Sequence, residues 1–175
     1  HILSQVVTRL DLQTKIYTVG RVNAQLHFND EYTRFVEFKT QNDYLYWDVE
    51  ITNKKANFTR DTLSYTVNRG EVFSYKESEI TLHDSLFLQD QTLIIERYLL
   101  NDAVAALRSN LTATAASKQG EIINLNFIGV NKKRNEAVLN TVMQVMQDDQ
   151  VEDKRLISKV SLAFINDRLD GLTKS

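Results

Sequence analysis

The chain of 175 residues is long enough for one domain with its own core, and its composition, 42% apolar and 25% charged, is that of a globular protein. Its formal net charge of -2 supplies no overall field that would attract nucleic acid. It contains no cysteine, which excludes disulfides, zinc thiolate sites and cysteine nucleophiles, and no apolar run approaches the ~18–20 residues needed to cross a bilayer.

The first elements follow from the spacing of apolar residues. Helical spacing of an apolar stripe predicts a short amphipathic helix that ends near Asp11. The segment 14–22 is then predicted as extended or loop chain, interrupted by Gly20. The residues of the helical stripe are Ile2, Leu3, Val6, Val7 and Leu10.

The middle third changes to the period of two that is typical of strands. β-Branched and aromatic residues predict strands at 44–53, 56–60, 62–67, 71–75 and 79–83. The sequence Asn68-Arg69-Gly70 predicts a tight hairpin turn with Gly70 at positive φ. A further strand is predicted at 91–99, with Ile94 and Ile95 as its buried centre.

A second helix is expected next, with Asn101 or Asp102 as its N-cap. A loop at 112–121, around Gly120, and a strand at 121–130, which looks like the strongest of the chain, are predicted to follow. Asn131 then caps the final helix. The apolar face of the second helix is expected to consist of Val104, Ala105, Leu107 and Leu111.

The last segment, VLNTVMQVMQDDQVEDKRLISKVSLAFINDRLDGL (138–172), predicts an unusually long helix. With the lead-in 131–137 it covers roughly 40 residues, or about 60 Å, whereas a compact domain of this size is only ~30–40 Å across. Val138, Val142, Val145 and Met146 form a stripe that we expect to pack on the sheet. Beyond an acidic interruption, Leu156, Val160 and Phe164 continue the apolar pattern past the core, so we expect them to contact another helix or another subunit.

These elements predict the α+β class: a mainly antiparallel sheet covered by helices on one face, with a long C-terminal helix extending from it. We expect a single domain, 1–175. Its base covers about 1–150, and an extended helical hairpin starts at about 151–175.

Signals of catalysis are weak. The sequence has no G-x-S-x-G, H-E-x-x-H or Walker motif, and His1, His27 and His83 lie far apart in it. A functional interpretation of the neighbours His83 and Asp84 is that they orient each other, but the end of a surface strand is the better interpretation. The acidic residues of 147–153 fall along a solvated helical face, and calcium would need loop oxygens. We therefore expect no catalytic residue, no metal and no cofactor.

Two clusters are candidates for binding. Lys132, Lys133 and Arg134 occupy the first turn of the long helix, where the helix dipole disfavours cations. A solvated turn is the ordinary interpretation, and contact with lipid headgroups or acidic sugars is the functional hypothesis. The second cluster is the aromatic-rich segment 44–75. Its rings are expected to pack within the sheet, although such platforms also bind sugars or single-stranded nucleic acid. Without a basic stripe beside them, nucleic acid is a poor partner.

The order of these elements resembles a known family. LSQVVTRLDL (3–12) resembles its first helix. ERYLLNDAVAALRSNL and the residues that follow, to 169, resemble its second half, with the pattern Ala137, Asn140, Thr141 and Lys154 followed by Ala163, Phe164 and Leu169. TVNRGEVFSY (66–75) is similar to an insertion in kinase-linked members. The family is that of Wzz-type polysaccharide co-polymerases (chain-length determinants), in particular the form attached to Wzc-type tyrosine kinases. The family often has Asp-Pro where this chain has Asn131-Lys132, and Asn caps a helix as Asp does.

The resemblance implies a periplasmic domain held between two inner-membrane helices that lie outside this chain, on the periplasmic face of the bacterial inner membrane. Such a domain forms a homo-oligomeric ring and regulates the chain length or export of exopolysaccharide, capsule or O-antigen, together with polymerase or export machinery. In kinase-linked members a cytoplasmic domain autophosphorylates on tyrosine. We expect this chain to be a non-catalytic piece of such a protein.

The alternative is an envelope carbohydrate-binding module that uses the aromatic sheet 44–75. Membrane-spanning segments on both sides of the chain would favour the co-polymerase, whereas a cleavable signal with no second span would favour the module. We expect the chain alone to be monomeric, and a longer chain with both membrane segments to form a closed oligomer.

Overall fold

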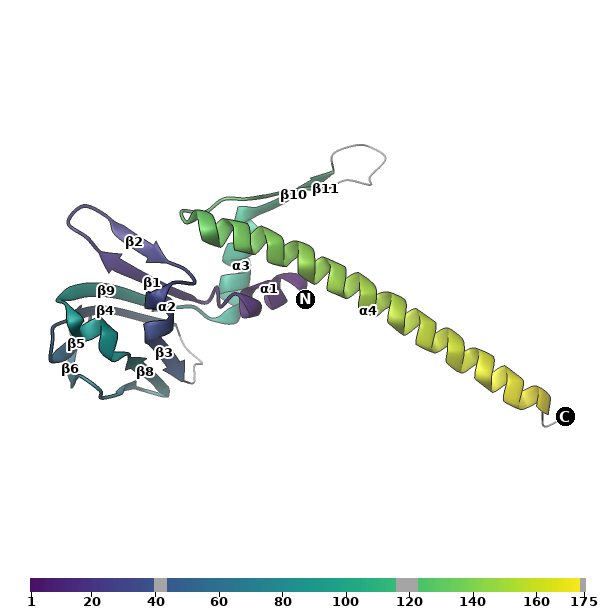
Figure 1. Ribbon diagram of the computed structural model, residues 1–175, viewed down its shortest axis with the longest axis horizontal. Coiled ribbons are helices and arrows are strands. Elements are labelled where there is room, and N and C mark those ends of the chain that lie inside the picture. Colours follow the sequence, from purple (N-terminus) through teal and green to yellow (C-terminus); the bar gives the residue numbers. More distant parts are fainter. Residues whose placement is uncertain (40–43, 116–122, 174–175) are drawn as a thin grey trace.

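The computed structural model describes residues 1–39, 44–115 and 123–173, with the side chains of the last helix described as far as Ile165. A base of sheets and short helices carries one long projecting helix (Figure 1), so the expected α+β class is confirmed. The elements are α1 (Ile2–Arg9), β1 (Thr14–Val19), β2 (Ala24–His27), α2 (Glu31–Phe35), β3 (Val36–Lys39), β4 (Leu45–Ile51), β5 (Lys55–Arg60), β6 (Leu63–Asn68), β7 (Phe73–Tyr75), β8 (Ser78–Leu82), the 3-10 helix η1 (Asp84–Leu88), β9 (Gln91–Arg97), α3 (Leu100–Asn110), β10 (Leu111–Ala115), β11 (Ile123–Phe127) and α4 (Lys132–Thr173).

The strands of the described residues form three antiparallel sheets. The main sheet has six strands in the order β2-β1-β9-β4-β5-β6. The second sheet has the order β3-β8-β7, and β10 and β11 form a separate two-stranded ribbon. Strand β9 lies between β1 and β4, so a strand from late in the chain occupies the centre of the main sheet.

The first hydrophobic core lies between the main sheet and the second sheet. Along β4, Trp47, Val49 and Ile51 are buried, while the residues between them are half-buried or exposed. Trp47 and Val49 lie opposite Ile95 and Leu93 of β9. The layer that covers them includes Phe73, Ile80, Leu86 and Phe87 from β7, β8 and η1.

Trp47 is the centre of an aromatic cluster in this core. Its ring lies edge-on to Phe58, Tyr65, Phe73 and Tyr75, with centroids 6.2, 5.9, 5.0 and 5.1 Å away. Edge-to-face pairs at these distances are favourable because the positive ring edge meets the negative ring face. The packing interpretation of the aromatic segment is therefore confirmed for these residues.

A second hydrophobic core joins α1, α3 and the first half of α4. The long helix therefore docks on α1 and on β11 and shares this core with α3, and it does not dock on the main sheet as its first stripe suggested. The physical reason is that the second sheet already covers the apolar face of the main sheet. The buried residues of this core are Val6, Val7, Leu12, Ala103, Leu107, Val138, Val142 and Val145.

Helix α4 is one uninterrupted rod of 42 residues, about 63 Å long at ~1.5 Å per residue. Its predicted cap is confirmed, because the backbone N–H of Arg134 donates to Asn131 Oδ1 at 3.0 Å. Asn131 Nδ2 also donates to the carbonyl of Leu26 at 3.1 Å and so ties the start of α4 to β2. The helix is continuous through its acidic midpoint. There, Asp148 Oδ2 accepts a hydrogen bond of 2.9 Å from Arg9 Nη1 of α1.

Residues 14–39 contain more regular structure than the sequence indicated. β1 and β2 form a hairpin, in which the Gly20 N–H donates to the Asn23 carbonyl at 3.0 Å. Helix α2 and strand β3 follow, and neither was predicted. Asp30 caps α2 by accepting from the N–H groups of Tyr32 and Thr33. Elements of four or five residues are too short to show a clear period, which explains the omission.

The turn at 68–70 forms, but it does not join two paired strands. Gly70 has the expected positive φ, 85°, and the Glu71 N–H donates to the Asn68 carbonyl at 3.0 Å. However, β6 pairs with β5, and β7 pairs with β8 in the second sheet. The hairpin prediction was wrong because Phe73 belongs to the second sheet. From there it stacks on Phe58 of the main sheet, with 4.0 Å between the ring centroids.

The N-cap predicted for α3 was wrong, and its predicted apolar face was right only in part. Its N-cap is Leu99, with no side-chain cap bond, and not Asn101 or Asp102. Of its predicted apolar face, Leu107 is buried in the second core, and Val104 and Leu111 pack against that core, although Leu111 already belongs to β10. Ala105 is exposed instead, and Ala103 is buried, because contact with α1 selects that side of α3.

The predicted strand at 121–130 is shorter and more exposed than expected. β11 covers only Ile123–Phe127 and pairs with β10, and Ile123 remains 54% exposed. The start of the predicted loop at 112–121 is part of β10, and the rest of it, around Gly120, lies outside the described residues.

Candidate functional site

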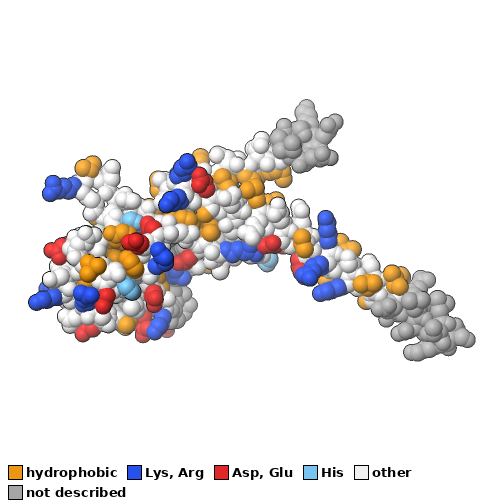
Figure 2. Space-filling view, viewed as in Figure 1, with side chains coloured by type: hydrophobic (Ala, Val, Ile, Leu, Met, Phe, Trp, Pro, Cys, Tyr) orange, Lys and Arg blue, Asp and Glu red, His pale blue; other side chains and the backbone are white. Residues whose placement is uncertain are grey.

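The outer half of α4 is the most conspicuous surface of the described chain. Every residue from 151 to 165 is exposed, and Leu156, Val160 and Phe164 are 59%, 62% and 60% exposed. Figure 2 shows hydrophobic side chains distributed along this projecting part. The structure thus places the three predicted contact residues together, outside both cores.

These side chains belong to two stripes. At 100° per residue, Leu156 and Val160 point in the same direction as the buried Val138 and Val142. We call Leu156, Ile157, Val160 and Phe164 the inner stripe, because it continues the face of α4 that docks on the base. Val151, Leu162 and Ile165 lie on roughly the opposite side, and we call them the outer stripe.

The three basic residues at the start of α4 do not form one site. Lys132 and Lys133 are exposed, and Lys132 Nζ lies 3.8 Å from Glu136 Oε1. Arg134 turns inward: its Nη2 donates to the carbonyl of Leu12 at 3.4 Å, and burial lowers the pKa of its guanidinium. The cap at Asn131 and the turn of the helix separate the three side chains, which sequence spacing alone does not reveal.

These three cations line two neighbouring cavities. Lys132 and Lys133 line a cleft of about 790 Å³ that also contains Asp30. Arg134 lines a separate cavity of about 330 Å³ between α3, the β1–β2 hairpin and the β11–α4 connection. The second cavity also contains Lys15, so it unites two cations that are far apart in sequence.

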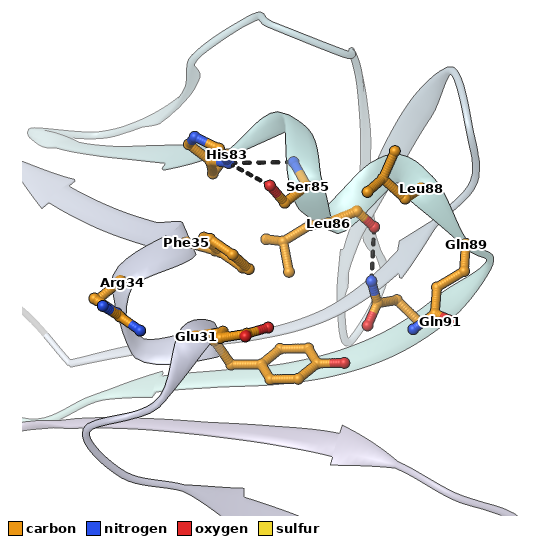
Figure 3. Close-up of a pocket in the computed structure, with 10 residues that line it drawn as sticks. Glu31, Arg34, Phe35, His83, Ser85, Leu86, Leu88, Gln89 and Gln91 are labelled. Carbon is orange, nitrogen blue, oxygen red and sulfur yellow. Dashed lines mark hydrogen bonds between the residues drawn. The ribbon is translucent and has the colours of Figure 1, made fainter.

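A further cleft, of about 620 Å³, lies between α2 and η1 and is shown in Figure 3. Phe35 stacks on His83, with centroids 5.0 Å apart and an interplanar angle of 15°. Gln91 Nε2 donates to the Leu86 carbonyl at 2.6 Å. Its Oε1 is buried with no hydrogen-bond partner among the described residues.

His83 and Asp84 do not orient each other. His83 Nδ1 lies 2.9 Å from Ser85 Oγ and accepts from the Ser85 N–H at 3.2 Å, so it caps η1. Asp84 pairs with Arg69, with Nε 3.1 Å from Oδ1, and this hydrogen bond lowers the pKa of the Asp84 carboxyl. His83 is exposed, which agrees with the interpretation as a surface strand end.

Sequence reasoning missed a polar network at His27. This side chain is 8% exposed, its Nε2 lies 2.9 Å from Thr18 Oγ1, and its Nδ1 lies 2.6 Å from Asp30 Oδ2. The order hydroxyl, imidazole, carboxylate is that of a nucleophilic triad. Here Asp30 also caps α2, so the network ties the hairpin to that helix. The only sequence signal was the i, i+3 spacing of His27 and Asp30.

The aromatic segment presents little ring surface to solvent. Trp47 and Phe58 are fully buried, and Tyr44 and Tyr65 are each 38% exposed. A sugar stacks only on an accessible ring face, so the alternative function as a carbohydrate-binding module on 44–75 would depend on these two tyrosines.

Within the described residues, no group of three or more His, Cys, Asp or Glu side chains is arranged to hold a metal ion. No described helix is both long and apolar enough to span a membrane. No protein-family model matches the chain, and no curated protein matches it significantly.

Proposed function

We propose that this chain is a non-catalytic, self-associating domain whose projecting helix packs against neighbouring copies. We further propose that it belongs to a polysaccharide co-polymerase on the periplasmic face of the bacterial inner membrane. Its partners there would be other copies of itself and the polymerase or export machinery. The observation that carries the first proposal is the outer half of α4, whose large apolar side chains are exposed on two sides.

The hydrophobic effect supports self-association. Burying an exposed Leu, Ile or Val side chain completely contributes about 1.5–3 kcal/mol. Leu156, Ile157 and Val160 are 59%, 66% and 62% exposed, so most of that free energy is still available for a contact. While Leu156, Ile157 and Val160 stay mostly in water, this contribution is not gained.

The two stripes favour a ring over a simple pair. A two-fold dimer buries the same patch on both subunits, whereas a ring joins two different patches of each subunit. The inner and outer stripes lie on roughly opposite sides of α4, as a head-to-tail contact requires. Each copy would place its inner stripe against the outer stripe of the next.

The assignment to a polysaccharide co-polymerase depends on the resemblance of the ordered motifs. The elements that carry it are the first helix, the second helix with the loop and strand that follow it, the segment 66–75, and the positions Ala137, Asn140, Thr141 and Lys154 in α4. In that family an extended helix and ring assembly occur together. A tyrosine autokinase domain, where present, would lie elsewhere in the full-length protein.

Cysteine cross-linking tests the packing, because this chain has no native cysteine. Leu156→Cys and Leu162→Cys are introduced singly and together into the full-length protein in its membrane, and a short bis-maleimide is added. We expect a ladder of multimers only for the double variant, since each inner stripe meets an outer stripe. Leu156→Cys combined with Lys159→Cys, which lies between the stripes, is the matched control.

Dimers from either single variant, with no ladder from the double, would replace the ring by a two-fold pair. No cross-linking from any variant would end the self-association proposal. A separate measurement tests the biological role: Leu156→Glu with Val160→Glu should change the length distribution of the surface polysaccharide on gels. A ladder without such a change would keep the assembly and reject the polysaccharide assignment.

A further inference from the structure

The cavity at the start of α4 combines apolar walls with two cations. It encloses about 330 Å³, at the lower end of the usual range of ~300–1,000 Å³ for ligand pockets. Leu12, Leu26, Leu107 and Phe127 supply apolar surface from four different elements or connections. These apolar walls favour an occupant with an apolar part, because they offer a small hydrated ion no hydrogen bonds in exchange for its water.

Lys15 and Arg134 line the same cavity without a carboxylate contact. Lys15 Nζ lies 4.6 Å from the centroid of the Tyr98 ring. Arg134 donates to one backbone carbonyl, and among the described residues neither cation forms an ion pair. Burial lowers the pKa of the Lys15 ammonium, and the nearby charge of Arg134 lowers it further. Two half-buried cations that repel each other are a costly arrangement, which an anion between them would relieve.

The other titratable groups near this pair leave an excess of positive charge. Glu96 lies opposite Lys15 in the register of β1 and β9 and attracts its ammonium group. Its Oε2 also accepts from the Tyr98 hydroxyl at 2.9 Å, so one of its oxygens is already engaged. Burial and Glu96 raise the pKa of the Tyr17 and Tyr98 phenols, which stay neutral donors at pH 7. Glu96 thus offsets the charge of Lys15, whereas burial is the main influence on Arg134.

We propose that this cavity binds an amphiphilic anion, with one phosphate or carboxylate group between Lys15 and Arg134 and an apolar body against Leu107 and Phe127. Charge-assisted hydrogen bonds are about twice as strong as neutral ones, and a guanidinium donates two in parallel to such oxygens. The apolar walls then distinguish the ligand from free phosphate. This inference is independent of the proposed self-association, because the cavity lies in the base and not on the projecting half of α4.

Amide NMR spectra of the chain, titrated with hexyl phosphate, inorganic phosphate and 1-hexanol, test both halves of the proposal. We expect saturable shifts with hexyl phosphate at Ala106, Gly129 and Arg134, which line the cavity. Inorganic phosphate and hexanol should each bind at least about tenfold more weakly, since each lacks one half of the interaction. Lys15→Gln and Arg134→Gln should each weaken hexyl phosphate binding by about tenfold.

Lys133→Gln is the matched control, because it removes an exposed cation that lies outside this cavity. Neither cavity variant should lower the thermal midpoint much, since each also removes a repulsion. Equal binding of inorganic phosphate and hexyl phosphate would overturn the proposal that the ligand needs an apolar part. If Lys133→Gln weakened binding as much as the cavity variants do, the binding would be due to general surface charge and the site would be rejected. If a variant does not fold, the wild-type shift map still decides: shifts clustered outside the cavity reject the site.

Discussion

Replacing Val145 and Val160 by Ala tests how α4 is divided between a docked half and a projecting half. Both residues lie on the same helix, and the substitution is chemically identical. Val145 is fully buried in the second core, whereas Val160 is 62% exposed. The gain in intrinsic helix propensity from Val to Ala, about 0.5 kcal/mol, is therefore common to both variants.

The expected magnitudes differ because of burial. Val→Ala removes two methyl groups, about 0.8 kcal/mol each when fully buried, and the cavity left behind raises the loss to about 2–3 kcal/mol. After the gain in propensity, Val145→Ala should lower the free energy of unfolding by about 1.5–2.5 kcal/mol. Val160→Ala should change it by less than about 0.5 kcal/mol, because most of its side chain is already in water.

Urea unfolding followed by far-UV circular dichroism measures both losses. The fluorescence of Trp47, the only tryptophan, reports on the first core in the same samples. Coincident transitions would establish that the two cores unfold together and that the two-state treatment is valid. Equal losses for the two variants would refute the division of α4. An undiminished stability of Val145→Ala would refute the docking of this half of α4 in the second core.

Three smaller predictions concern local features. Asn131→Ala should lower the free energy of unfolding by about 1 kcal/mol or more, because it removes the cap of α4 and the hydrogen bond to Leu26. Asn131→Asp keeps the cap and loses only the bond to Leu26. If the urea midpoint of Asn131→Asp were no higher than that of Asn131→Ala, the capping role would be contradicted. Gly70→Ala should lower the free energy of unfolding by about 1–2 kcal/mol, because Gly70 has φ 85° while an added Cβ meets no neighbouring atom. Gly70→Asn should lower it less. Equal urea midpoints for the wild type and these two variants would count against the left-handed turn. Burial and a hydrogen bond to Glu96 raise the pKa of Tyr98 in the folded protein. The stability that this shift contributes is therefore complete below about pH 10 and is lost as pH rises through the higher pKa of the folded state. Tyr98→Phe should reduce the fall in urea midpoint between about pH 9 and pH 11.

Several elements were predictable because their local pattern and their tertiary role agree. The strand predicted at 44–53 corresponds to β4, in which alternate side chains from Trp47 to Ile51 are buried. Asn131 was predictable as a cap because its side chain bonds to a backbone group only three residues away. The short helix at 2–10 formed with Val6 and Val7 inside, as its stripe indicated.

Pairing between strands was less predictable, because it depends on residues that are distant in sequence. Residues 68–70 have the local signature of a hairpin turn, yet Phe73 belongs to the opposite layer of the first core. Likewise, the pattern at 121–130 predicted a strand but not its partner, and β11 forms a ribbon with β10 outside the main sheet.

The candidate sites divide in the same way. The exposure of Leu156, Val160 and Phe164 followed from helix length alone, since a rod longer than its core must project from it. Lys15 and Arg134 are 119 positions apart, and no spacing rule connects residues on a strand and a distant helix. Only the folded chain brings them to one cavity.

The sequence by itself determined the class of the fold, the continuity of α4 and the position of its cap, because periodicity and capping act over one or two turns of chain. The tertiary structure decided which face of each helix is buried, which strands pair, and that Arg134 turns inward while Lys132 and Lys133 remain in solvent. Those outcomes depend on which apolar surfaces are already covered when two elements meet. That competition is settled by contacts between residues far apart in the chain.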